Sequence, residues 1–340
     1  MDGRKSIFLL ALLLVLVIIF STGMGYIKIS TLDVVKIIIA RFYSDGHLLR
    51  GISNIFPYVI WEVRLPRILT SAIVGSGLSI AGVIFQGILL NPLADPYTLG
   101  ISAGAAFGAS IALILNISFL GMYSVPLFAF MGAVATLVVV MALSSSGGSV
   151  SSNNLILAGI IVAAILSAGI SFIKYVADEQ VSVIIFWLMG SFGSKGWPDV
   201  FLTFTFVLIG FGICIFFARD LNIMSLGDRS AFSLGVNTNR IRMTLLVTAS
   251  LITAVCVAVS GIIGFVGLII PHLMRFFVGP DSRKLLPASA LTGAILLLSA
   301  DTITRAVLPT EVPIGVLTAL IGGPFFCYIF MKRRGVAGNV

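Results

Sequence analysis

The chain has 340 residues, of which 59% belong to the apolar set AVILMFWYC and only 10% are charged. A soluble domain carries about 25% charged residues because its surface faces water, so this composition excludes a soluble protein. The net charge of +8 comes without the dense Lys/Arg run that binds nucleic acid. The apolar share is enough for roughly ten spans of ~20 residues, and the sequence therefore predicts an all-α polytopic membrane protein.

Runs without Asp, Glu, Lys or Arg mark the predicted spans, and the first begins at Ser6. It follows Arg4-Lys5 as a signal peptide would, but it is longer than a usual signal core and no A-x-A site follows, so we expect an uncleaved span. We expect one transmembrane domain over residues 1–340. Its ten predicted spans lie near residues 6–27, 68–90, 96–116, 125–143, 155–173, 200–218, 243–263, 264–278, 285–300 and 312–331.

Three segments of the chain are difficult to assign as membrane spans. The charge-free stretch 243–274 is too long for one helix, and we divide it at its helix-breaking residues, which are Ser260, Gly261, Gly264 and Pro271. Span 285–300 is short for a crossing. Segment 180–194 is too short to cross comfortably and is expected to lie at the membrane interface.

Basic residues set the expected orientation. Arg4-Lys5 and the cluster 332–334 both belong on the cytoplasmic side, which requires an even number of spans. With ten spans the cytoplasmic segments carry a net charge of +7 and the outer segments +1. We therefore expect ten crossings of the cytoplasmic (inner) membrane with both termini in the cytoplasm.

Glycines recur at the spacing that lets membrane helices pack closely. Small residues at such positions allow backbones to approach, which replaces the hydrophobic force that lipid does not supply. The sequence therefore predicts a compact bundle. The two glycine runs are Gly100, Gly104 and Gly108, and Gly261, Gly264 and Gly267.

The residues that carry enzyme chemistry are scarce. There is no Gly-Lys dipeptide, so the chain has no phosphate-binding loop of the Walker type. The two histidines, His47 and His272, and the three separated cysteines form no metal-ligand or disulfide pattern. We expect neither an enzyme nor a cofactor or metal site. An ion-coupled secondary transporter stays open as an alternative, although it usually places carboxylates in mid-span, whereas Asp95, Asp301 and Glu311 fall near predicted span ends.

The predicted cytoplasmic segment 219–242 differs from an ordinary loop. Apolar residues stand among its polar ones, and Gly227 and Gly235 interrupt it, so we expect two short helices joined by a turn, with Ser225 and Asp228 as caps. One interpretation is a basic loop held inside by its charge. The other is a docking surface for a cytoplasmic partner.

Several sequence blocks resemble one family of membrane proteins. They occur in the family's order between about residues 56 and 332, and the second and fifth are the most specific. The chain resembles the FecCD-type permeases, the membrane subunits of ABC importers for iron–siderophores, haem and cobalamin. The blocks are RLPR at 64–67, GVIFQGILLNPLADPYTLGISAGAAFGA at 82–109, LILAGI at 155–160, SLGDRSAFSLGV at 225–236, GFVGLIIPHLMR at 264–275 and EVPIGVLTALIGGPFF at 311–326.

The resemblance implies a ten-helix subunit, similar to the cobalamin permease bundle, that forms a homodimer with the substrate path on its twofold axis. Two copies of a separate ATPase would bind on the cytoplasmic side, and an extracytoplasmic binding protein would deliver the substrate. Segment 219–242 matches the part that couples to the ATPase. The residues on that motif are Ser225, Leu226, Gly227, Asp228, Ala231, Leu234 and Gly235.

The resemblance also implies outward-facing arginines that dock the binding protein, and Arg64, Arg67 and Arg305 match them. Pro66 would place Arg67 near a helix N-terminus, where the helix dipole disfavours a cation, so an external partner is favoured. The alternatives are an i, i+4 pair of Arg305 with Asp301 and, for the other two arginines, contact with lipid head groups.

The resemblance further implies a cytoplasmic gate beside the segment 144–154. Its polar residues would line the gate or form a flexible loop, and composition does not separate these interpretations. The candidate gate residues are Ser151, Ser152, Asn153 and Asn154. The substrate also stays open among a ferric siderophore, haem, cobalamin and an oxyanion, because the family's selectivity lies mainly in the binding protein.

Overall fold

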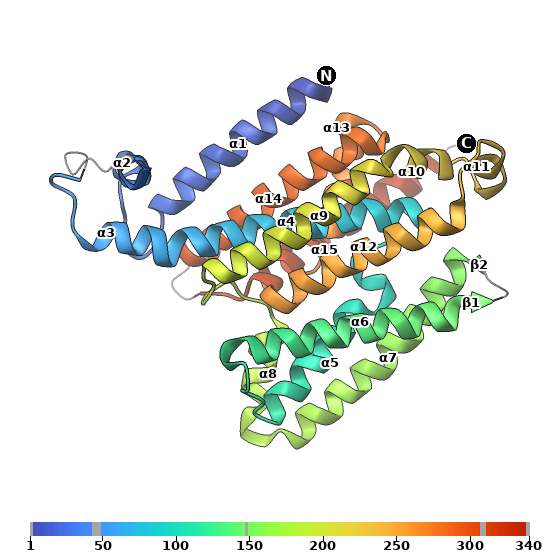
Figure 1. The fold of residues 1–340 in the computed structure, drawn as a ribbon, viewed down its shortest axis with the longest axis horizontal. Helices are drawn as coiled ribbons and strands as arrows, with labels where there is room; N and C mark the ends of the chain where they lie inside the picture. Colours follow the sequence, from blue (N-terminus) through green and yellow to red (C-terminus); the bar gives the residue numbers. More distant parts are fainter. Residues whose placement is uncertain (1–2, 43–48, 147–148, 307–310, 338–340) are drawn as a thin grey trace.

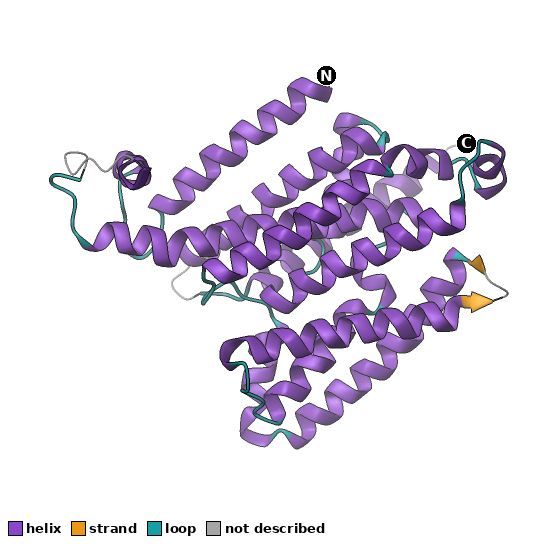
Figure 2. Ribbon diagram, in the orientation of Figure 1, coloured by secondary structure: helices purple, strands orange, loops and turns teal. Residues whose placement is uncertain are grey.

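The computed structural model describes residues 3–42, 49–146, 149–306 and 311–337, and they are almost entirely helical (Figures 1 and 2). The first half contains α1 (Gly3–Gly23), α2 (Thr31–Phe42), α3 (Ile55–Tyr58), η1 (Val59–Arg64), α4 (Leu65–Ile88), η2 (Pro96–Leu99), α5 (Ile101–Ile114), η3 (Gly121–Tyr123), α6 (Ser124–Ser144) and α7 (Ser152–Val176). The second half contains η4 (Asp178–Gln180), α8 (Val181–Leu188), α9 (Trp197–Phe216), α10 (Ala218–Met224), α11 (Asp228–Ser233), α12 (Thr238–Ser260), α13 (Val266–Val278), α14 (Ser282–Ala306) and α15 (Ile314–Ala337). A hairpin of two-residue strands, β1 (Ser145–Ser146) and β2 (Ser149–Val150), joins α6 to α7.

Seven of the described helices are long and apolar enough to cross a membrane, which agrees with a multi-pass membrane protein. They are Lys5–Gly23, Ile55–Ile88, Gly121–Ser144, Ser152–Val176, Trp197–Phe216, Thr238–Ser260 and Ser282–Ala306. Three shorter apolar helices, Ile101–Ile114, Val266–Val278 and Ile314–Cys327, complete the set, and every predicted span overlaps one of these ten segments.

The helix α4 lies at the centre of the larger group of helices, and it contacts α1, α9, α12, α13 and α14. The helices α5–α8 form a smaller group beside it, joined to the rest through α12 (Figure 1). One end of the bundle carries α3 and the connector between α1 and α2, and the opposite end carries α10, α11 and the hairpin (Figure 1). We call them the α3 end and the α11 end.

Glycines let the helices of both groups touch at the backbone. A Cβ added to Gly82 of α4 would clash with the carbonyl oxygen of Gly267 on α13, and one added to Gly108 of α5 would clash with the backbone of Phe128 on α6. The packing prediction is thus confirmed at these positions. It is wrong at Gly264, where an added Cβ would meet no atom within 4 Å.

The helix that contains α4 begins earlier than predicted. It starts at Ile55 and continues through the π-helical segment η1 into α4. Pro66 lacks an N–H and its ring crowds the carbonyl one turn before it, and a wider π turn relieves that crowding. Arg67 therefore lies inside a long helix, and the prediction that it stands near a helix N-terminus is wrong.

Other boundaries also need correction. Span 285–300 is not short, because α14 extends over 25 residues. Pro271 does not end a helix but lies inside α13, whereas Gly261 does mark the end of α12. Of the two caps expected in 219–242, Ser225 is confirmed as the C-cap of α10, whereas Asp228 is wrong because it is the first residue of α11 and Gly227 precedes it as the cap.

The short helix α2 was not predicted, because a search for charge-free runs excludes a segment that contains Asp33, Lys36 and Arg41. Its apolar face buries Val34 and Ile37 in a small core that also includes residues of η1 and α4. The segment 180–194 contains the short helix α8, and its position at the membrane interface stays a prediction.

The close contact at Gly82 yields a stability test. We expect Gly82→Ala to lower the melting temperature of the purified chain in detergent, because the added Cβ meets a carbonyl that two packed helices hold in place. The cost is about 1–3 kcal/mol, the usual range for overpacking.

The matched control is Gly212→Ala in α9, where an added Cβ meets no atom within 4 Å. Alanine is a better helix former than glycine, so this variant keeps or raises the melting temperature. Equal melting temperatures for the two variants would contradict the importance of the α4–α13 contact.

Candidate functional sites at the two ends of the bundle

Two of the three predicted docking arginines bind residues 21–27 at the α3 end, which are the last residues of α1 and the start of its link to α2 and are called the connector from here on. Arg64 on η1 donates to the carbonyl oxygen of Thr22 at 2.7 Å and to that of Ile27. Arg305 in the last turn of α14 donates to two more carbonyls of this connector, at 2.7 and 3.0 Å. The two guanidinium groups therefore fix the connector to the ends of two helices that are far apart in sequence.

Arg67 forms the centre of a buried ion-pair cluster. Its Nε and Nη2 donate to the carboxylate of Asp301 on α14 at 3.0–3.2 Å, and its Nη1 donates to Glu311 at 3.2 Å. Asp301 is 1% exposed, whereas the Glu311 side chain is 56% exposed. One arginine thus joins α4, α14 and the segment before α15.

These contacts bear on two sequence interpretations. Asp301 pairs with Arg67 and not with Arg305, so the alternative interpretation of Arg305, an i, i+4 pair with Asp301, is wrong. Arg64 and Arg67 are only 6% and 8% exposed, so the chain itself covers most of both side chains, and their role in docking stays a prediction. Sequence reasoning also missed Asp301 and Glu311 as partners of Arg67, because no local pattern connects residues more than 230 positions apart.

At the α11 end, α10 and α11 present an apolar surface. Leu226, Phe232 and Leu234 are 64%, 77% and 62% exposed, although each is large and apolar. Gly227 and Gly235, with φ of +98° and +82°, form the turns around α11, and this positive-φ conformation is unfavourable for residues with a Cβ. The predicted pair of short helices is confirmed.

Polar contacts fix these helices to the bundle. Arg242 of α12 donates to Asp228 at 2.7 Å, and Asn222 of α10 donates to Asp281 at 2.7 Å. Partial burial alone would raise the pKa of Asp281, but hydrogen bonds from Asn222 and Arg283, together with the charge of Arg283, hold this pKa below its ordinary value. Ala231, which is fully buried, faces the bundle rather than the exposed surface.

The four candidate gate residues lie at the start of α7. Ser151 caps this helix by accepting a hydrogen bond from the Asn154 N–H at 3.2 Å, and Ser152 donates to the carbonyl of Ile88 at the end of α4. Asn153 and Asn154 are exposed. The segment before α7 thus contains a hairpin and a capped helix start, while residues 147–148 lie outside the described part.

Comparison with known proteins decides the family. The profile of the FecCD transport family matches residues 13–332, nearly the whole chain. The chain belongs to the FecCD transport family. Members of this family are transport permease subunits of ABC importers.

Individual relatives match over nearly their full length, and their names give different cargoes. The chain is 37% identical to the hemin transport system permease HmuU of Yersinia pestis, covering 98% of both chains. It is 38% identical to the molybdate import system permease MolB of Haemophilus influenzae, covering 97% of both. Among solved structures, a metal-chelate type ABC transporter in an inward-facing conformation superposes with a TM-score of 0.84 at 35% identity, covering 97% of this chain and 99% of that one.

Proposed function

We propose that this FecCD-family chain is the membrane-spanning subunit of a binding-protein-dependent ABC importer for a metal chelate of the iron–siderophore, haem or cobalamin class. The observation that carries the proposal is the near-complete superposition on a metal-chelate type ABC transporter. In this proposal two copies of the chain form a homodimer, and the substrate moves inward along the axis between them. ATP is hydrolysed on a separate subunit, since this chain has no phosphate-binding loop.

All ten apolar segments cross the membrane in this proposal, and both termini lie in the cytoplasm. The bias of basic residues supports this orientation. The α11 end is then cytoplasmic and the α3 end faces outward. The capped start of α7, with Ser151, Ser152, Asn153 and Asn154, lies on the cytoplasmic side, and we assign it to the gate.

The surface of α10 and α11 docks the ATPase. Exposed large apolar residues in a cytoplasmic segment favour a protein partner, because water penalises such a patch when it is uncovered. Leu226 and Leu234 belong to the family motif, and Phe232 extends the same exposed surface. Gly227, Gly235, Ser225 and Asp228 shape the turns, and Ala231 anchors α11 to the bundle.

Arg64, Arg67 and Arg305 bind the extracytoplasmic binding protein. Each of these arginines already has partners within the chain. The binding protein must therefore either replace those partners or contact the small part of each guanidinium group that stays exposed. Arg64 and Arg305 both hold only backbone carbonyls and no carboxylate, and Arg305 is the better suited for exchange because it is less buried than Arg64. Arg67 would have to leave two carboxylates, which is costly for a buried charge.

The alternative is an ion-coupled secondary transporter. The carboxylate of Asp301 is buried inside α14, which extends beyond the predicted end of its span, so the spans are not free of acidic residues. Its bidentate pairing with Arg67 neutralises it and leaves it less suited to carry a proton or Na⁺.

Reconstituted transport tests the proposal. In proteoliposomes that contain this chain, its ATPase and its binding protein, we expect uptake of haemin, cobalamin or a ferric siderophore to require ATP. Uptake persists when a protonophore or a sodium ionophore is added. Uptake that collapses with an ionophore while ATP is abundant would instead support the secondary transporter.

A turn variant tests ATPase docking. We expect Gly227→Val to leave a folded dimer in the membrane but to lose the ATPase from affinity-purified complexes, because valine does not tolerate the φ of +98° on which the exposed surface depends. The matched control is Gly121→Val, which also has positive φ and open space but lies outside segment 219–242, in η3. Equal ATPase recovery in both variants would remove the docking assignment.

Docking of the binding protein is tested at Arg305. Arg305→Gln keeps an amide donor for the connector carbonyls but removes the charge, so we expect about tenfold weaker docking and a shallower dependence on salt. The control is Arg283→Gln, the same change at the other end of α14. If Arg305→Gln binds with unchanged affinity and salt dependence, this arginine serves only the connector.

A further inference from the structure

Two separate cavities lie along the same two helices, the long helix of η1 and α4 and the helix α9. We call the strip between these two helices the groove. The two helices run side by side from the α3 end, where Trp197 at the start of α9 donates its indole N–H to the carbonyl of Trp61 at 2.9 Å. The cavity nearer the α3 end, which we call the upper cavity, has a volume of about 510 Å³. The other is called the lower cavity. The upper cavity is lined by Arg41, Pro57, Tyr58, Trp61, Glu62 and the start of α9.

The upper cavity combines one cation, one carboxylate and aromatic faces. The guanidinium carbon of Arg41 lies 5.9 Å from the centre of the Trp61 ring, which in turn stacks on Trp197 with ring centres 6.1 Å apart. Arg41 and Glu62 are both exposed, and neither belongs to an ion pair among the described residues. The cavity thus offers a site for an anion and a site for a cation against an aromatic wall.

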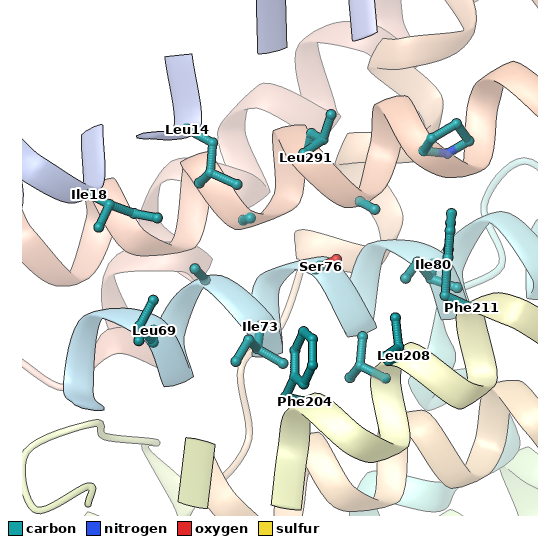
Figure 3. Close-up of a pocket in the computed structure, with 15 residues that line it drawn as sticks. Leu14, Ile18, Leu69, Ile73, Ser76, Ile80, Phe204, Leu208, Phe211 and Leu291 are labelled. Atoms are coloured by element: carbon teal, nitrogen blue, oxygen red, sulfur yellow. The ribbon is translucent and has the colours of Figure 1, made fainter. Parts of the chain in front are cut away.

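The lower cavity is almost wholly apolar. It has a volume of about 390 Å³ and lies between α1, α4, α9 and α14, with Ser76 as its one hydroxyl-bearing lining residue (Figure 3). In Figure 3, Leu14 and Ile18 of α1 close one side, and Phe204 and Leu208 of α9 close another. Such a lining suits a hydrocarbon chain and leaves a water molecule without partners.

Helical spacing connects the two cavities. On the long helix the lining residues 58, 62, 69, 73, 76 and 80 recur at intervals that keep one face, and on α9 the residues 197, 201, 204, 208 and 211 do the same. From Glu62 to Ile73 the helix rises ~16 Å, at 1.5 Å per residue. This matches the depth of hydrocarbon in one leaflet, about half of a 30 Å core.

We propose that this groove binds one zwitterionic phospholipid from the leaflet at the α3 end. Arg41 binds the lipid phosphate, Glu62 and the Trp61 face bind its ammonium group, and one acyl chain fills the lower cavity beside Ile73. The polar cavity at membrane-interface depth and the apolar cavity one leaflet deeper, along the same helix faces, carry this proposal. It does not depend on the substrate or on the import mechanism.

Native mass spectrometry of the purified chain in detergent tests the site. After incubation with vesicles of equimolar phosphatidylethanolamine and phosphatidylglycerol, we expect one phosphatidylethanolamine to remain bound per chain. Arg41→Ala and Glu62→Gln should each lower this retention by about tenfold, the effect of losing one charge-assisted contact. The matched control is Lys36→Ala, which removes a basic side chain of α2 that does not line the cavity and retains the lipid as wild type does.

The lower cavity is tested by Ser76→Leu, which fills it and should reduce the retention of phosphatidylethanolamine. Its control is Ser171→Leu, the same change at an exposed position of α7. The side chains of Arg41 and Glu62 are both exposed, so Arg41→Ala and Glu62→Gln should fold normally. Loss of bound lipid in these two variants therefore supports the proposal even if Ser76→Leu does not fold. Retention of both lipids alike, unchanged retention in those two variants, or a wild-type chain that keeps no lipid would each overturn it.

Discussion

Backbone contact between helices is the constraint on which this bundle depends. Inside a bilayer, burial of apolar side chains gives helices little reason to associate, so packing must come from surfaces that fit closely. Gly75 of α4 meets Gly293 of α14, and Gly82 meets Gly267 of α13, at separations that leave no room for a Cβ. These contacts place α4 at the centre, and the position of α4 then decides where both ends of the molecule lie.

The charged residues of the α3 end are placed by the same packing. Because α4 and α14 touch along their length, Arg67 and Asp301 are brought together at one end of the pair, where a bidentate contact satisfies both charges. Arg64 and Arg305 then have connector carbonyls within reach. The three arginines are thus a set of structural contacts within the chain. The docking role that we propose for them would compete with these contacts for the same donors.

The α11 end follows a different rule. There the large apolar residues are outside and the small residue Ala231 is inside, so the surface is shaped for contact rather than for solubility. Its ion pair and its Asn222–Asp281 hydrogen bond anchor the short helices without covering that surface. The two ends therefore differ in kind: one is polar and internally paired, and the other is apolar and uncovered.

The amino-acid sequence by itself determined the class of protein, the ten apolar segments and the paired helices of 219–242, because hydropathy, charge-free length and turn residues are local properties. It missed α2, whose three charged residues interrupt a face that only packing identifies as buried. It also placed Arg67 at a helix end, since the π turn that carries a helix through Pro66 has no plain local signal. The partners of Arg67, the burial of Arg64 and the shared groove of α4 and α9 were decided only by the tertiary structure, because each depends on which helices become neighbours, and that follows from fits between distant backbones.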